Sequence, residues 1–409
     1  MQLDTDFVRA QFPAFKEPSL QGWSFFENAG GSYACQQVID RLTEFYTKTK
    51  VQPYYPFPAS ITAGEKMDES YRRLSAYLNV GDDEVNFGPS TSQNVYVLAN
   101  ALRPMWNDGD EIIVSCQDHE ANAGAWRRLG NTGLVVKEWH IDKVTGRLNP
   151  EALDELISPK TRMIAFPHCS NVIAHINPVK EIADRAHQAN AIVVVDGVSY
   201  APHGFPDLKA LDADIYLFSL YKTWGPHLGL MSVKRNLMRQ MENQSHHFNK
   251  DVVRCKLTPA GPDHAQIAAA SGIADYFDTL YQHHFRESAD SAEKGRRLHA
   301  LFAKHERSLL VPLLDFLDSR DDVDVIGPVD PNIRAPTVSF VPKKKQVAAV
   351  AEALKEQKLM VGSGNFYGVR PLQEMGIDPG PGVIRASFVH YTTMEEIGHL
   401  VGGLEIALR

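Results

Sequence analysis

The sequence predicts an α/β fold with a mostly parallel sheet, followed by a smaller α+β region. In the middle of the chain, short apolar runs alternate with helical patterns, which is typical of a parallel sheet covered on both faces. After about residue 272 a long helical stretch and only a few strands follow. A chain of 409 residues is long enough for two domains. We expect a large domain over 18–284 and a small domain over 285–409, with residues 1–17 packed on the small one.

Six apolar runs read as the buried strands of the large domain. They are Glu111–Ser115, Leu134–Trp139, Arg162–Pro167, Ala191–Asp196, Asp214–Ser219 and Gly229–Val233. Helices are expected at Gln93–Leu102, at Asn149–Ile157 and at Pro178–Asn190. For the last of these, Asn177 would be the cap and Pro178 the first helical residue.

The C-terminal part predicts two strands among three helices. The expected order is a helix (Ala289–Leu317), a strand (Thr337–Val341), a helix (Gln346–Lys358), a strand (Val383–Phe388) and a final helix. Thr392 and Glu395 have the spacing of a capping box at the start of that final helix.

Composition excludes several classes of protein. The net charge is −8 and the basic residues form no patch, so we expect no nucleic-acid partner. The one basic run, Lys343–Lys345, is read as a solvated surface. Four cysteines without metal-site spacing predict neither a disulfide framework nor a metal site, and favour a cytoplasmic protein. The N-terminus lacks the apolar core of a secretory signal, and no apolar run is long enough to span a membrane.

Polar side chains follow several of the apolar runs. Asp196 ends one strand, and Ser219 and Lys222 follow another. Ligands of open α/β sheets bind at the carboxyl ends of the strands, so these residues predict a binding site. Burial disfavours the ammonium form of lysine, and a lysine with a lowered pKa is what Schiff-base chemistry requires. Thr91 and Ser92 open a helix, where a phosphate dianion would bind. Taken singly, each residue also fits a turn, a cap or a surface role.

Together, these motifs resemble the class V aminotransferases, and among them most closely the cysteine desulfurase and selenocysteine lyase group. These are fold-type-I enzymes that use pyridoxal 5'-phosphate (PLP). The resemblance covers nearly the whole chain, with Asp196-Gly197-Val198-Ser199 and Ser219-Leu220-Tyr221-Lys222 as its main motifs. It implies a sheet of the seven-stranded type in the large domain. It also implies that Lys222 binds PLP as a Schiff base and that Asp196 keeps the pyridine nitrogen protonated.

The same resemblance implies roles for further residues. The phosphate would be bound by Thr91, Ser92, Ser219 and Tyr221; the ring would be contacted by His119, Asn171 and Ser199; and the substrate would lie near Asn28, Ala29 and Tyr367, with its carboxylate on Arg385. A planar arginine fork suits two-point contact with a carboxylate. The partners implied are an amino-acid substrate and a second copy of the chain, with the active sites at the dimer interface.

Two departures from the family pattern bear on the reaction. Cysteine desulfurases carry a nucleophilic cysteine in a stretch resembling Arg-x-Gly-His-His-Cys, and the matching stretch here runs from Gly362 to Tyr367. Tyr367 stands at the thiol position and Gly362 at the arginine position, so we expect no persulfide chemistry. The partner-chain phosphate contact is altered to Ala260-Gly261-Pro262.

The resemblance implies a reaction through an external aldimine and removal of the Cα proton by Lys222. Our first interpretation is a desulfurase-like lyase that cleaves a C–S bond or eliminates at the β or γ carbon. Transamination and racemisation are the alternatives, and a non-catalytic PLP-binding regulator is a remote one.

Overall fold

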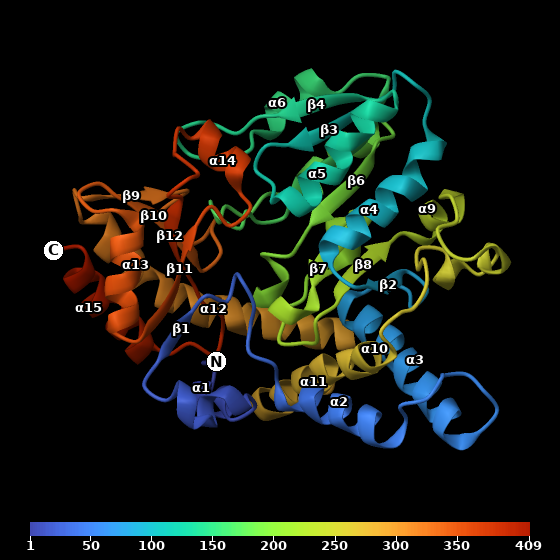
Figure 1. Cartoon of the computed structure of the whole chain (residues 1–409), viewed down its shortest axis with the longest axis horizontal. Helices are drawn as coiled ribbons and strands as arrows, with labels where there is room; N and C mark the ends of the chain where they lie inside the picture. The colour runs from blue at the N-terminus through green and yellow to red at the C-terminus, as the bar shows by residue number, and fades with distance from the viewer.

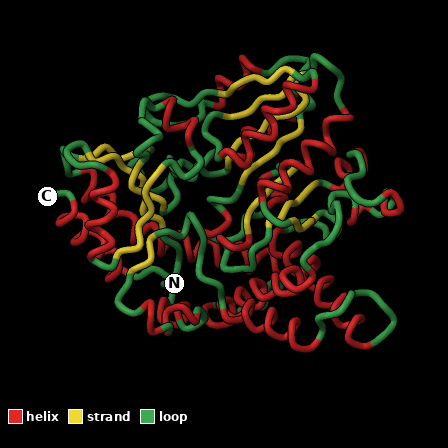
Figure 2. The backbone as a smooth tube through the Cα atoms, viewed as in Figure 1, coloured by secondary structure: helices red, strands yellow, loops and turns green.

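The computed structural model describes residues 1–409 and contains two sheets (Figures 1 and 2). The larger has seven strands, in the order β2 (Val85–Gly88), β8 (Gly229–Val233), β7 (Ile215–Ser219), β6 (Ile192–Asp196), β5 (Thr161–Pro167), β3 (Glu111–Ser115) and β4 (Val135–Trp139). Neighbours pair in parallel from β7 to β4, whereas β8 runs antiparallel to both β7 and β2. The predicted α/β fold with a mostly parallel sheet is confirmed.

Residues of each central strand alternate between two apolar cores. In β6, Val193 and Val195 belong to one core and Val194 belongs to the other. The helices α4 (Thr91–Leu102) and α5 (Glu120–Arg128) pack on the Val194 side, and α7 (Val179–Gln188) packs on the opposite side. Burial on both faces explains why these strands appear in the sequence as continuous apolar runs.

The second sheet has five strands, in the order β1 (Ser24–Phe26), β11 (Leu359–Gly364), β12 (Val383–Ser387), β10 (Thr337–Pro342) and β9 (Val323–Ile326). Sequence patterning found only β10 and β12. β1 pairs in parallel with β11, although it falls within the range 18–284 expected for the large domain. The domain limits themselves remain a prediction.

Helix α12 (Ser291–Asp318) connects the two parts of the molecule (Figure 1). Its first half contributes Leu298 and Phe302 to the core of the large sheet. Its second half contributes Leu309 and Leu313 to the core of the small sheet. One continuous helix therefore fixes the two sheets against each other.

The remaining helices surround these sheets. They are α1 (Thr5–Arg9), α2 (Gln36–Lys48), α3 (Pro58–Leu78), α6 (Pro150–Leu156), α8 (Leu208–Leu211), α9 (Arg235–Gln240), α10 (His264–Ala270), α11 (Gly272–His284), α13 (Val347–Glu356), α14 (Val369–Glu374) and α15 (Met394–Ala407). None of the helices is both long and apolar enough to cross a membrane. Near the N-terminus, Arg9 pairs with Glu396 of α15 at 2.9 Å, and Asp4 contacts His283 of α11.

Three predicted helix starts were wrong. α4 begins at Thr91, with Ser90 as its cap, rather than at Gln93. α7 begins at Val179, because the side chain of Asn177 is used in tertiary hydrogen bonds and does not cap it. The capping box of α15 is formed one residue later than predicted, by Thr393 and Glu396. Both threonine–glutamate pairs have the required spacing, and the extended backbone at Thr393 decides between them.

Candidate active site

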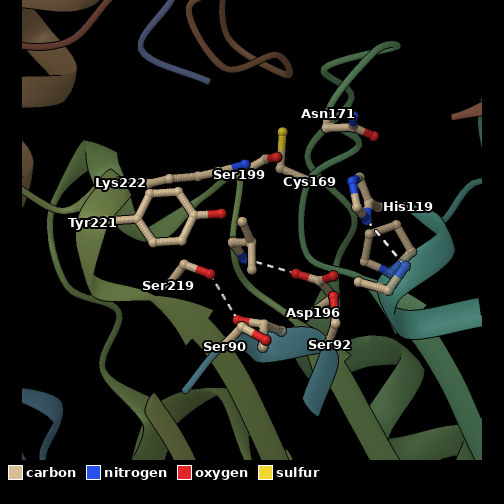
Figure 3. A pocket seen from close by; sticks show the side chains of 14 residues that line it. Ser90, Ser92, His119, Cys169, Asn171, Asp196, Ser199, Ser219, Tyr221 and Lys222 are labelled. Carbon is tan, nitrogen blue, oxygen red and sulfur yellow. Dashed lines mark hydrogen bonds between the residues drawn. The ribbon is translucent and has the colours of Figure 1, made fainter. Parts of the chain in front are cut away.

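One pocket at the carboxyl ends of the parallel strands gathers most of the predicted site residues (Figure 3). It is lined by Ser90, Thr91, Ser92, His119, Ala121, Pro167, Cys169, Asn171, Asp196, Val198, Ser199, Ser219, Tyr221 and Lys222. All nine residues that the sequence predicts to bind the cofactor are among them. Arg385, Asn28, Ala29 and Tyr367 lie outside this lining.

Lys222 is a buried lysine without a hydrogen-bond partner. It ends a 3₁₀ turn, Leu220–Lys222, that directly follows β7, and only 8% of its surface is exposed. Burial and, to a smaller extent, the nearby Arg385 together lower the pKa of Lys222 to about 8, against the opposing effects of Asp196 and Glu27. At pH 7 about a tenth of its amine is therefore neutral, far more than for a lysine with the ordinary pKa, and the neutral form is the one that a nucleophile or base requires.

Asp196 ends β6, the strand beside β7. Its carboxylate accepts a hydrogen bond from the backbone N–H of Val198 at 2.8 Å and has no other protein donor. Burial raises the pKa of Asp196 to about 6, with the Val198 bond and Lys222 acting in the opposite direction. A buried carboxylate with one unmatched oxygen is suited to a cationic or N–H group of a ligand.

The opposite end of the pocket can bind an anion. The N-terminus of α4 lies there, with the side chain of Ser90 as its cap and the hydroxyls of Thr91 and Ser219 at 2.8 Å from each other. A Cβ on Gly229 would lie only 2.5 Å from the Thr91 nitrogen, so glycine is needed for β8 to pass this close. Because α4 begins at Thr91 and Ser90 caps only the N–H of Gln93, the N–H groups of Thr91 and Ser92 are free for a phosphate.

His119 caps α5 and is neutral. Its Nδ1 accepts a hydrogen bond from the backbone N–H of Ala121 at 3.0 Å. Burial, and to a smaller extent Lys222 and Arg385, lowers the pKa of His119 to about 3. A neutral imidazole at the pocket wall is suited to packing on a flat ring.

Arg385 is buried beside the pocket and is already paired. It lies on β12 with 2% of its surface exposed, and its Nη1 donates to the carbonyl of Asn171 at 3.1 Å. Its Nη2 donates to Glu27 at 2.5 Å, and the ring of Phe366 lies 3.7 Å from the guanidinium. Glu27 is not predicted from the sequence, where its only signal is its place directly before Asn28.

Asn28 and Ala29 line a small adjoining cavity rather than the main pocket. The side chain of Asn28 donates to the carbonyl of Ser387, and the N–H of Ala29 donates to the hydroxyl of Ser387. The cavity also touches Ser199, which lines the main pocket as well. The two residues are thus next to the site, held there by β12.

Tyr367 lies at the rim of the site, with 72% of its surface exposed. Its carbonyl accepts from the N–H of Glu120, and its ring lies 5.3 Å from the ring of His119. Phe366 and Tyr367 both have left-handed backbone, with φ of 50° and 58°. The side chain of Asn171 donates a 2.8 Å hydrogen bond to the carbonyl of Phe366. This bond fixes the loop to the pocket.

The four cysteines are free, and Cys169 is the one that lines the pocket. Its thiol lies within reach of the carbonyl of Ala174, and burial raises the pKa of Cys169 to about 12. Cys35 is buried with its pKa also raised to about 12. The pKa of Cys116 is raised still further by burial and by Glu138. None of these three thiols is poised as a thiolate.

One group of side chains has the composition of a metal site. Cys116, His140 and Glu374 each bring one ligand atom within 4.8 Å of the others. The Cys116 thiol, however, donates to Glu138 at 3.0 Å, and Arg127 pairs with the same carboxylate. The Cys116 thiol is therefore already hydrogen-bonded within the protein. That the protein binds no metal remains a prediction.

Comparison with known proteins places this chain in a family. The model of the class V aminotransferase family matches residues 24–400. An aminotransferase-like protein of Gibberella zeae is 33% identical, with 98% of each chain covered. A cysteine desulfurase-like protein of Aspergillus flavus is 30% identical, over 97% of this chain and 88% of that protein. The chain belongs to the class V aminotransferase family and is a PLP-dependent enzyme of its cysteine desulfurase-like branch.

A solved structure supports the same fold. A cysteine desulfurase of Escherichia coli superposes with a TM-score of 0.83 at 23% identity, covering 100% of this chain and 99% of that one. The fold is accordingly that of the fold-type-I PLP enzymes, as the sequence motifs predicted.

Proposed function

We propose that this enzyme is an amino-acid lyase that eliminates at the β or γ carbon, for example by cleaving a C–S bond, without forming a persulfide on the protein. The observation that carries the proposal is Lys222, a buried amine with a lowered pKa that is free of protein partners. A base, a carboxylate clamp and an electron sink suffice for such an elimination, which needs no thiol of the protein.

The residues present fit PLP. Lys222 would carry the cofactor covalently, Asp196 would pair with the pyridine nitrogen, and His119 would lie on the ring. The phosphate would bind at the α4 N-terminus, and Tyr221 and Ser219 would complete its contacts. The unpaired oxygen of Asp196 and the unpaired, buried side-chain oxygen of Asn171 support this assignment, because each is an acceptor that lacks a donor in the chain. When bound, PLP supplies an electron sink for the electron pair left at the substrate's Cα.

The chain's own groups divide the work. Arg385 would hold the substrate's α-carboxylate, which fixes the Cα–H bond relative to the pocket. Nζ of Lys222 would accept the Cα proton and could pass it to the departing group. The surroundings of Asp196 set its pKa. Its carboxylate would remain the partner of the ring nitrogen throughout.

The absence of persulfide chemistry is a part of the proposal. Tyr367 stands where the family's nucleophilic cysteine is found, and a phenol does not store sulfur. Cys169 is the thiol nearest to the reacting groups, and burial keeps it protonated. A free sulfur species, rather than a protein-bound one, would then leave with ammonia and an oxoacid.

Transamination and racemisation use the same base and clamp, and they remain the alternatives. The relative named as an aminotransferase-like protein supports transamination as an alternative. A regulator without turnover is the remote alternative, disfavoured by the pairing of a base with a clamp.

The experiment is an amino-acid panel on the holoenzyme. Cofactor absorbance, ammonia, oxoacid and the optical purity of the remaining substrate are followed together. Ammonia and oxoacid released in equal amounts over many turnovers support the lyase. A single turnover that resumes when an oxoacid is added identifies a transaminase, and loss of optical purity alone identifies a racemase.

We also propose a cytoplasmic homodimer, from the same resemblance. Tyr96 is exposed near the predicted partner contact and lines a groove together with Ala260, Gly261 and Pro262. Burying such side chains would favour association. Light scattering of the purified holoenzyme tests this: a mass of one chain contradicts it.

A further inference from the structure

The Arg385 clamp of the substrate-free enzyme already holds a carboxylate, that of Glu27. Glu27 follows β1 directly, whereas Arg385 lies on β12, 358 residues further along the chain. Nη2 of Arg385 donates to Oε1 of Glu27 at 2.5 Å. The arginine is almost fully buried, and the glutamate is partly exposed, with 28% of its side chain accessible. The pair is thus a buried cation facing a carboxylate at the edge of the site.

The chain leaves a space for this carboxylate. A Cβ on Gly362 would lie 2.4 Å from Oε2 of Glu27, and a Cβ on Gly30 would lie 2.7 Å from Oε1. A larger residue at Gly30 would press on the Glu27 side chain alone, whereas one at Gly362 would press on both Glu27 and the ring of Phe366. Two glycines, one on each side, therefore permit the pairing, and one of them stands where desulfurases carry an arginine.

The pairing is incomplete on both partners. Oε2 of Glu27 is buried and accepts no hydrogen bond, and Nε of Arg385 is buried and donates none. A well-fitted bidentate pair would leave neither atom unmatched. Arg385 is otherwise held by the carbonyl of Asn171 and by the ring of Phe366, so the guanidinium stays in place when Glu27 moves.

The charge of Glu27 also acts on the active site. It acts on the amine of Lys222, whose pKa it raises, while Arg385 lowers that pKa. These three charged groups therefore share one environment, and a substrate carboxylate that reaches Arg385 comes close to the charge of Glu27. Two carboxylates on one guanidinium repel each other in a buried site.

We propose that Glu27 is a specificity residue that occupies the Arg385 clamp in the free enzyme and is exchanged for the substrate's α-carboxylate. This inference rests on the proposed function, in which Arg385 binds that carboxylate. Ligand binding is then an exchange of one carboxylate for another, so Glu27 lowers the affinity for any simple monocarboxylate. Ligands without a carboxylate cannot displace it and gain nothing from the clamp.

The test measures carboxylate binding without turnover. Propionate, which has no amino group and cannot react at the cofactor, is titrated into the holoenzyme and into the cofactor-free enzyme by calorimetry. Glu27→Gln should bind propionate roughly tenfold more tightly than the wild type, which corresponds to about 1.4 kcal/mol. Glu120→Gln is the matched control: it removes an equal charge near the pocket, from a carboxylate that is 3.5 Å from Arg370. Its propionate affinity should stay unchanged.

A second variant displaces Glu27 without altering it. Gly30→Ala places a methyl group against Oε1, where it meets Glu27 alone, and should also tighten propionate binding, which keeps the test decisive if Glu27→Gln folds poorly. Wild-type or weaker binding in both variants overturns the proposal and makes Glu27 a fixed structural partner. Failure of the clamp itself gives a different result, because propionate would then bind Arg385→Ala as well as the wild type.

Discussion

Lys222 and Asp196 are brought together by two neighbouring parallel strands. Asp196 is the last residue of β6 and pairs with Leu217 of β7, and the 3₁₀ turn after β7 ends at Lys222. Both side chains line the same pocket, and each opposes the effect of burial on the pKa of the other (Figure 3). The sheet therefore fixes an amine and a carboxylate in one buried pocket, and the predictions below depend on that pair.

Lys222 is expected to be the residue that carries PLP. Borohydride treatment of the yellow holoenzyme should leave one PLP adduct, on the peptide that contains Lys222. Lys222→Ala should abolish the adduct, whereas Lys209→Ala, a change at an exposed lysine of α8, should leave it intact. An adduct on another lysine in peptide mass spectrometry contradicts the assignment.

PLP capture by the cofactor-free enzyme should depend on pH in a way that reports the pKa of Lys222. Only the neutral amine attacks the aldehyde, so the capture rate should rise with pH and level off above about 8, where the lowered pKa of Lys222 lies. A lysine with an ordinary pKa of about 10.4 would still show a rising rate at pH 9 to 10. Stopped-flow absorbance across this range separates the two cases.

Asp196→Asn should slow turnover far more than it weakens cofactor binding. The substitution keeps the shape but removes the charge that pairs with the ring nitrogen, which should cost on the order of 3 kcal/mol in the barrier, or roughly a hundredfold in kcat. The phosphate contacts at α4 are unchanged, so PLP affinity measured by fluorescence is the internal control. Turnover at the wild-type rate would rule out this role.

Arg385→Ala should weaken an amino-acid substrate by roughly 2–4 kcal/mol in kcat/KM, since a carboxylate is then left unpaired in a closed site. The corresponding decarboxylated amines should lose much less on the same change. Steady-state kinetics with acid and amine pairs makes the comparison, and equal losses for both would show that Arg385 has a structural role only.

Incubation with cysteine should leave no sulfur on the protein. Intact-mass spectrometry of the holoenzyme should show no adduct of about 32 Da, the mass of one sulfur atom that a transferable persulfide would add. A cysteine desulfurase treated in parallel serves as the positive control. If an adduct forms, Cys169→Ser and Cys255→Ser identify whether the pocket thiol or the least buried thiol carries it, and the proposed lyase without persulfide is then wrong.

Much of the fold followed from local pattern alone. The strands of the large sheet are buried on both faces, so each is a continuous apolar run that needs no knowledge of its neighbours. The same property revealed the site, because Asp196 and Lys222 directly follow such runs. The strands β1, β9 and β11 gave no such signal. β1 and β9 have only three and four residues, and most of β11 is partly exposed rather than buried on both faces. β1 is recognisable only through its pairing with β11, more than 300 residues away.

The sequence by itself determined the fold class, the family and the positions of Lys222, Asp196 and Arg385, since each of these is marked by neighbours along the chain. Only the tertiary structure decided that β8 runs antiparallel, that Thr393 rather than Thr392 caps the last helix, and that Glu27 occupies the Arg385 clamp. The last of these joins residues 358 positions apart across two strands of the small sheet. Such a pair depends on how strands are ordered in space, and no local periodicity or spacing encodes that order.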